Sequence, residues 1–284
     1  MKILRKRGEG RYLMRILLLV AAFAAVLEWA GVPVEATPIT FTASGTNSNT
    51  GQNLSASVTF DTDTSGNLIV TLTNTSTADV VAPSDVLTAV FFNISGDPTL
   101  TGSSALLNSG STVLFAPSTP VSGTLSPSGP NVGGEWAYNP NVSSTDPDLT
   151  GTNQGISSAG FGIFGPGNRF NTSSNLQGPD SPDGLQYGLT SAGDNPTTGN
   201  SPVTGGNALI KNSVVFTLSG LPAGFDPSTG ISNVVFQYGT SLTEPSLQGT
   251  CINCPQPIPE PASVLLLGSG LAGIGWLRKR FVKD

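Results

Sequence analysis

The middle of the chain alternates apolar side chains with Ser and Thr, and this period of two limits the folds open to it. Residues 55–60 read SASVTF and residues 68–73 read LIVTLT. Successive side chains of a β-strand point to opposite faces, so the pattern is typical of a sheet with one buried and one wet face. Further runs rich in Val, Ile, Thr and Phe recur between clusters of Gly, Asn, Ser and Asp. The predicted strands are 39–43, 54–60, 68–74, 87–94, 112–115, 134–138, 159–164, 185–189, 208–218 and 234–238.

Between Pro38 and Pro257 no stretch keeps a helical period with caps at its ends. We therefore expect residues 37–250 to form an all-β domain, an antiparallel β-sandwich or jelly roll. Within it, residues 139–204 hold few apolar side chains and many Gly, Pro, Asn, Ser and Asp. That composition predicts a long irregular loop.

Charge is strongly segregated along the 284 residues. Ten of the twelve Lys and Arg residues lie in the first fifteen or last seven positions. Between Pro38 and Pro257 there are thirteen acidic residues but only two basic ones, Arg169 and Lys211. We expect no nucleic-acid partner, because phosphate binding requires clustered basic side chains. His is absent, which excludes Ser-His-Asp and Cys-His catalysis.

The first 36 residues have the layout of a secretory signal peptide. An apolar run over residues 16–27 follows a basic start and precedes the small-residue site Val34-Glu35-Ala36. The basic residues are Lys2, Arg5, Lys6, Arg7, Arg11 and Arg15. We expect export by the secretion machinery and cleavage by signal peptidase between Ala36 and Thr37. An uncleaved anchor helix is the alternative, but the run is shorter than the roughly 20 residues that span a bilayer.

The other end of the chain combines a stalk, an apolar helix and a basic cluster. Prolines punctuate residues 251–261, which are expected to be extended, and residues 262–284 form a hydrophobic tail. A helix over residues 262–277 would be about 24 Å long, slightly shorter than the hydrocarbon core of a bilayer. The basic triplet after it is expected to stay on the cytoplasmic side.

Pro259-Glu260-Pro261, the glycine-studded apolar helix and the basic cluster together resemble the PEP-CTERM sorting domain of exported bacterial proteins. The resemblance covers about the last 30 residues. It implies an inner-membrane precursor, recognition by a membrane-embedded exosortase, removal of the helix, and a final place at the cell surface or outside the cell. The resemblance assigns recognition to Pro259, Glu260 and Pro261, and the membrane stop to a basic cluster. That cluster is Arg278, Lys279 and Arg280. A plain single-span anchor is the alternative.

Residues 61–67 match the first half of an oxygen-rich calcium loop. Asp61, Asp63 and Ser65 occupy its positions one, three and five, but Leu72 stands where an EF-hand needs a bidentate Glu. A hairpin turn between two strands explains the same residue types. Both a weak calcium site and a plain turn remain open.

A second acidic group lies in or beside the long loop, at Asp146, Asp148, Asp180, Asp183 and Asp194. Its members could converge on one calcium ion or serve as solvated turn residues. Two carboxylates are also the minimum for a glycosidase, and Glu135, Asp146 and Asp148 are the candidates. The sequence selects no pair among them.

Cys251 and Cys254 are the only cysteines of the chain. Zinc would need two further Cys or His ligands, so a zinc site is excluded. In an exported protein a local disulfide is expected, with a redox-active or intermolecular pair as alternatives.

Taken together, these features predict an exported, non-enzymatic protein of the cell surface or extracellular matrix. We expect no cofactor. Calcium is the one exception that the acidic groups of the chain would allow. The alternatives are a polysaccharide- or ice-binding module and a carboxylate-pair glycosidase. Four aromatic residues could stack on sugars or pack in the core. They are Trp136, Tyr138, Tyr187 and Tyr238.

Overall fold

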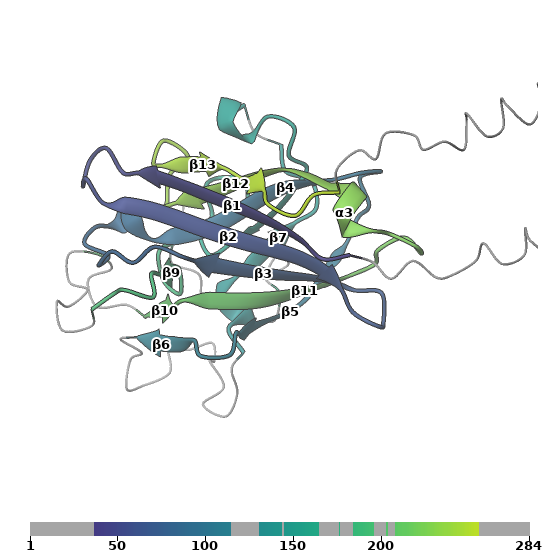
Figure 1. Ribbon diagram of the computed structural model, residues 1–284, viewed down its shortest axis with the longest axis horizontal. Coiled ribbons are helices and arrows are strands. Elements are labelled where there is room, and N and C mark those ends of the chain that lie inside the picture. The colour runs from purple at the N-terminus through teal and green to yellow at the C-terminus, as the bar shows by residue number, and fades with distance from the viewer. Residues whose placement is uncertain are drawn as a thin grey trace, which may run out of the picture. The chain divides into compact units, whose positions relative to one another are not determined.

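The structure is a computed structural model that describes residues 37–114, 131–143, 145–164, 176, 184–195, 203 and 208–255. Strands dominate this part of the chain, and they form two sheets (Figure 1). The strands are β1 (Ile39–Thr46), β2 (Asn53–Thr62), β3 (Leu68–Asn74), β4 (Leu87–Ile94), β5 (Thr101–Leu107), β6 (Thr112–Leu114), β7 (Ala137–Asn139), β8 (Gln154–Ser157), β9 (Leu189–Thr190), β10 (Leu209–Lys211), β11 (Ser213–Ser219), β12 (Ile231–Tyr238), β13 (Ser246–Gln248) and β14 (Thr250–Cys251). The short helices are η2 (Pro83–Asp85), η3 (Gly133–Glu135), η4 (Pro147–Leu149) and α3 (Pro227–Gly230).

The first sheet has six strands in the order β14-β1-β2-β3-β11-β5. Its pairings are all antiparallel, and β2 pairs with β3 from Ala56 opposite Asn74 to Thr62 opposite Leu68. Leu54, Ala56, Val58 and Phe60 of β2 are buried, whereas the residues between them are partly exposed. The period of two in the sequence therefore correctly predicted one buried face.

The second sheet has eight strands, with the path β13-β12-β4-β9-β10-β6 and with β7 and β8 added beside β4. Its centre is the antiparallel pair of β4 and β12. Strands β9 and β10 run parallel, and every other pairing of the described strands is antiparallel. The expectation of a mostly antiparallel all-β domain is thus confirmed.

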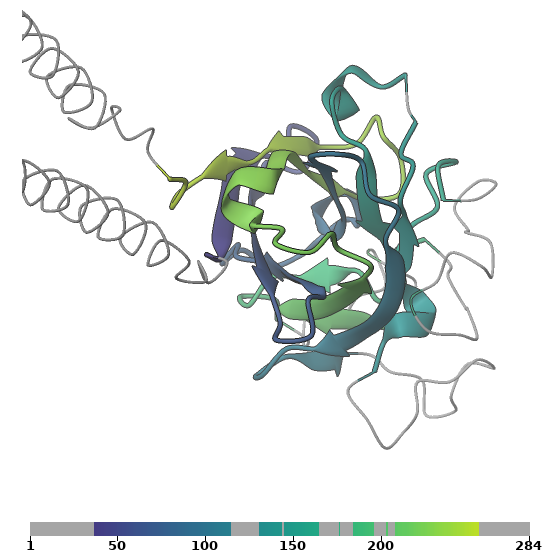
Figure 2. The same ribbon diagram turned by 90° about the vertical axis from the view of Figure 1, so that its right-hand side faces the viewer.

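One hydrophobic core joins the two sheets. Phe60 on β2 lies against Phe92 on β4, with ring centroids 4.9 Å apart, and both side chains are fully buried. Trp136, which lies between η3 and β7, packs on Phe216 of β11 with ring centroids also 4.9 Å apart. Figure 2 views the described strands close to end-on, with α3 at the near end. Contacts between large rings from different sheets hold the two sheets against each other.

Strand β4 is buried on both of its faces. Phe92 and Ile94 belong to the main core, whereas Ala89 and Phe91 pack with Leu149 and Phe164 in a second cluster. Leu149 and Phe164 come from the stretch predicted as a long irregular loop. A few apolar side chains in that polar stretch therefore pack on the outer side of β4.

The same stretch also contains β8, a strand that the sequence did not predict. The segment 159–164 was predicted as a strand but forms turns, because Phe161 and Gly162 have positive φ angles of 51° and 73°. The predicted strand 208–218 divides into β10 and β11 at Asn212, whose φ is 108°.

Smaller differences concern the remaining predicted strands. Residues 133–135 form η3, and only Ala137–Asn139 is a strand in that region. Strand β9 begins at Leu189, at the end of the predicted run 185–189. Strand β5 was missed because its sequence, TGSSALL, lacks the alternation of apolar residues.

Candidate functional site

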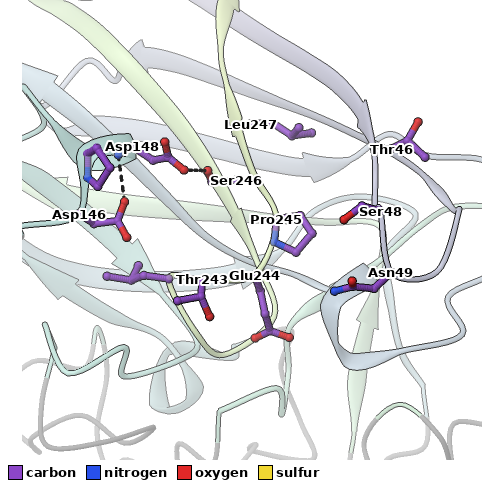
Figure 3. Close-up of a pocket in the computed structure, with 12 residues that line it drawn as sticks. Thr46, Ser48, Asn49, Asp146, Asp148, Thr243, Glu244, Pro245, Ser246 and Leu247 are labelled. Atoms are coloured by element: carbon purple, nitrogen blue, oxygen red, sulfur yellow. Dashed lines mark hydrogen bonds between the residues drawn. The ribbon is translucent and has the colours of Figure 1, made fainter.

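An open pocket of about 430 Å³ lies where three connections meet (Figure 3). One wall is the β1–β2 loop, another is η4, and the β12–β13 connection runs between them. The lining residues are Thr46, Ser48, Asn49, Asp146, Pro147, Asp148, Leu242, Thr243, Glu244, Pro245, Ser246 and Leu247. This volume is within the range of sites that hold small molecules.

The β1–β2 wall is held by a buried carboxylate. Asn47 and Thr50 both donate hydrogen bonds to Oδ1 of Asp85, each at 2.8 Å. Asn47 also donates to Ser84 Oγ at 2.8 Å, so the loop is tied to η2. These contacts direct the neighbouring Ser48 and Asn49 side chains outward, and both are exposed.

The β12–β13 connection is held by side chains together with a backbone turn, in which the N–H of Glu244 donates to the carbonyl oxygen of Ser241 at 3.0 Å. Oε2 of Glu244 accepts hydrogen bonds from the backbone N–H groups of Thr240 at 2.7 Å and Ser241 at 2.8 Å. Nε2 of Gln237 donates to the carbonyl oxygens of Ser241 and Glu244 at 3.1 Å and 3.2 Å. The connection also needs Gly239, whose φ is 72°.

The third wall is the short helix η4, which Asp146 caps. Oδ1 of Asp146 accepts a hydrogen bond from the backbone N–H of Asp148 at 2.9 Å, as a capping Asp does. Oδ2 of Asp148 accepts a hydrogen bond from Ser246 Oγ at 2.5 Å, which joins η4 to β13 (Figure 3).

The pocket is acidic and rich in hydroxyl groups. Asp146, Asp148 and Glu244 line it, and none of the described residues in its lining is Lys or Arg. Within the described ranges, no three acidic or Cys residues gather as a group that could hold a metal ion. A pocket with this lining can accept hydrogen bonds from a polar ligand and donate hydrogen bonds to it, and it repels anions.

The predicted calcium loop forms the turn between β2 and β3. Oδ1 of Asp63 accepts hydrogen bonds from the N–H groups of Ser65 at 2.8 Å and Asn67 at 2.9 Å, and Oδ2 accepts one from Asn67 Nδ2. The bonds from Asn67 lower the pKa of Asp63 below its usual range. Oδ1 of Asp61 accepts a bond from Thr62 N–H. This is the geometry of an Asp turn.

The second acidic group is divided in the structure. Asp146 and Asp148 line the pocket, whereas Asp194 is buried beside Thr190 and accepts a hydrogen bond from the N–H of Val80 at 3.1 Å. Burial and a hydrogen bond to Asp79 raise the pKa of Asp194. The remaining two candidates, Asp180 and Asp183, lie outside the described residues.

Glu135 and the four aromatic residues lie in the interior. Glu135, on η3, is 6% exposed. Burial and, to a smaller extent, the negative charge of Glu135 raise the pKa of Tyr187 to about 12. Glu135 is not among the residues that line the pocket with Asp146 and Asp148. Trp136, Tyr138, Tyr187 and Tyr238 all belong to the main core. The interpretation of these rings as core residues is therefore confirmed, and none of them offers a face to a sugar.

The end of the described chain is fastened to its beginning. Cys251 and Cys254 form a disulfide, with their Cα atoms 5.7 Å apart. Asn253 accepts a hydrogen bond from the N–H of Thr40 at 2.7 Å and donates one to the carbonyl of Pro38 at 2.9 Å. The last strand, β14, pairs with β1.

Comparison with known proteins identifies the segment that follows. A family model described as the PEP-CTERM protein-sorting motif matches residues 257–280. The chain carries a PEP-CTERM sorting motif. The match includes every residue assigned above to recognition and to the membrane stop, and it confirms the resemblance seen in the sequence. These residues are Pro259, Glu260, Pro261, Arg278, Lys279 and Arg280. No curated protein and no solved structure matches the chain.

The PEP-CTERM motif implies export and exosortase-dependent sorting to the cell surface. Residues 256–284 and 1–36 lie outside the described residues, while Thr37 is the first described residue and is exposed. Signal-peptide cleavage after Ala36 stays a prediction. Among the residues that the structure describes, no helix has the length and apolar character needed to cross a membrane.

Sequence reasoning missed most of the pocket. Thr46, Ser48, Asn49 and Glu244 carry no motif, and they come from segments about 200 residues apart. Only Asp146 and Asp148 were singled out beforehand, and then as partners of other acidic residues. No local signal in the sequence could have found the site, because it exists only where three connections meet.

Proposed function

We propose that the protein is an exported, non-enzymatic component of the cell surface or extracellular matrix. In this proposal the apolar segment 262–277 holds the precursor in the inner membrane. An exosortase then recognises Pro259, Glu260 and Pro261 and removes the tail, and the β-domain is released. The single observation that carries the proposal is the sorting motif over residues 257–280.

The chemistry of the body supports a role without catalysis. The chain has no His. Of the glycosidase candidates, Glu135 lies in the core, whereas Asp146 and Asp148 share a pocket wall and accept hydrogen bonds that cap η4 and join it to β13. We also propose that the body needs no resident cofactor, which elemental analysis of the purified protein would test.

The sorting proposal is tested with Glu260→Ala and with a variant that replaces Pro259 and Pro261 by Ala. Pro255→Ala is the matched control, because Pro255 lies just outside the matched segment. Cell fractions from the native host are probed for the protein, and its carboxyl terminus is mapped by mass spectrometry. We expect the motif variants to accumulate in the inner membrane with intact tails, and the control to be released.

Release of the Glu260→Ala variant at the normal rate would contradict the sorting role. Full-length protein at steady state in unaltered cells would contradict tail removal altogether. Full-length protein in the cytoplasm would contradict export. Each result is distinguishable by the same fractionation and mass measurement.

We further propose that the two sheets are the layers of a β-sandwich. The pair of Phe60 and Phe92 supports this, because each ring comes from a different sheet and both lie in one core. In aligned sandwiches the strand directions of the two layers differ by about 30°. A crystal structure with the layers crossing near a right angle would contradict the aligned form.

A second candidate function, binding of extracellular polysaccharide, is favoured by the pocket. Its hydroxyl, amide and carboxylate side chains are the groups that bind sugar hydroxyls, and Leu242, Pro245 and Leu247 supply apolar surface. Binding of ice is less supported, because the chain has no repeating unit that would place Thr residues at regular spacing. A glycan array and a thermal-hysteresis assay on the same sample separate the two.

A further inference from the structure

We propose that the pocket formed by the β1–β2 loop, η4 and the β12–β13 connection binds a polymer of cationic amino sugars. This inference rests on the second candidate function above and names its ligand class. The ammonium groups of the polymer would lie against the pocket carboxylates. The hydroxyl and amide side chains of the opposite wall would form hydrogen bonds with the sugar hydroxyls.

The charge of the lining points to a cationic ligand. Asp146 and Asp148 lie on one wall and Glu244 on the connection between the walls, and the described part of the chain contributes no basic residue to the lining. Lys211 is the one basic residue within the described ranges, and its Nζ donates to the carbonyl oxygen of Asp194 at 2.7 Å. A ligand that covers three carboxylates removes water from them, which is unfavourable unless the ligand brings compensating positive charge.

The arrangement of the carboxylates favours several separate cationic groups over one metal ion. Within the described residues they do not gather into a metal-binding group. Asp148 is exposed and uses one oxygen for Ser246, whereas Glu244 uses Oε2 for two backbone N–H groups. A polymer with a charge on each repeating unit matches carboxylates that are spread over a pocket.

The remaining lining groups favour a sugar over a simple polycation. Thr46, Ser48 and Asn49 are exposed on the β1–β2 wall and can exchange hydrogen bonds with hydroxyl groups. Pro245 and Leu247 are half-buried and offer apolar surface for the C–H face of a sugar ring. A peptide of lysines would use the charge of the pocket but not its hydroxyl wall.

The test uses the full chain purified in detergent and three probes of matched length. The probes are a glucosamine oligomer, the same oligomer with every amine acetylated, and an oligolysine of equal charge. Binding is measured by calorimetry at low and at moderate salt. We expect the glucosamine oligomer to bind about tenfold more tightly than its acetylated form, and salt to reduce this difference.

Variants test whether the binding takes place at this pocket. Asp148→Asn and Glu244→Gln keep an oxygen that accepts the existing hydrogen bonds but remove the charge. Each is expected to weaken glucosamine binding about threefold, and the double variant about tenfold. Asp97→Asn is the control, since it removes one charge from an exposed residue away from the pocket lining. Circular dichroism verifies that every variant is folded.

Equal binding of the amine and acetylated oligomers would overturn the cationic ligand but leave polysaccharide binding in place. Oligolysine binding as tight as that of glucosamine would overturn the choice of a sugar. No binding of any probe, or an equal effect of the Asp97→Asn control, would overturn the inference at this pocket. None of these results bears on exosortase sorting, which is measured separately in cells.

Discussion

Asn47 Nδ2 donates a hydrogen bond to Asp85 Oδ1 at 2.8 Å, and this contact ties the β1–β2 loop to η2. Both side chains are buried, at 0% and 2% exposure. The amide of Asn47 contacts Asp85 and two atoms of Ser84 at once. The wall of the pocket that carries Ser48 and Asn49 thus depends on one buried amide.

Asn47→Ala is expected to lower the free energy of unfolding by about 2 kcal/mol, because it takes a donor from a buried carboxylate. Chemical denaturation monitored by Trp fluorescence measures the change. Asn49→Ala is the control: its side chain is exposed, and we expect a change within about 0.5 kcal/mol. Equal effects of the two substitutions would refute the anchoring role of Asn47.

Asp194 should make the protein less stable as the pH rises. Its pKa is raised by burial and by the hydrogen bond to Asp79, so the folded state holds the proton more tightly than the unfolded state. The stabilising contribution is full below the unfolded pKa, about 3.9, and is lost as the pH rises through the folded pKa. Unfolding free energies measured across this interval should therefore fall with increasing pH.

Asp194→Asn should abolish that fall and make the variant more stable than the unaltered protein above the folded pKa. An Asn at this position can still accept the bond from Val80 and can donate to Asp79. Lys211 contacts the backbone carbonyl oxygen of Asp194 and not its carboxyl group, so the substitution leaves this contact in place. An unchanged pH profile would show that Asp194 titrates normally.

Asp63 should make the protein more stable as the pH rises, the opposite of the effect of Asp194. Its pKa is lowered mainly by the hydrogen bonds from Asn67, so its contribution is present above the unfolded pKa and is lost as the pH falls through the folded one. Asp63→Asn should destabilise the protein at neutral pH, and the difference should vanish in acid. Calcium added during the same thermal scans decides between the two interpretations of this turn. Stabilisation of the unaltered protein alone would favour a calcium site.

Replacing Cys251 and Cys254 together by Ser should lower the free energy of unfolding by about 2 kcal/mol, the loop-closure value for so short a loop. Hydrogen exchange is expected to rise at Thr40 and Ile252, whose N–H groups pair across the two ends of the described chain. Unchanged protection there would mean that the pairing of β1 with β14 does not need the disulfide.

Much of the six-stranded sheet was predictable because its information is local. In β2 and β3 the apolar residues at every second position mark the buried face, with Ile69 as the exception, and the residues of the turn at Asp63 appear consecutively in the sequence. Strand β8 was not predictable, since Gln154 and Gly155 are buried by contacts with β4 and β7 and not by their own hydrophobicity. The pocket could not be predicted for a related reason. Its walls are adjacent only after the strands have paired.

The sequence by itself determined the sorting tail and the alternating strands, because each depends on the order of neighbouring residues. Only the tertiary structure decided which acidic residues share a site. It separates Asp148 from Asp194 and brings Asp148 beside Glu244, because long-range strand pairing sets the positions of the connections. The composition of a connection does not contain that information.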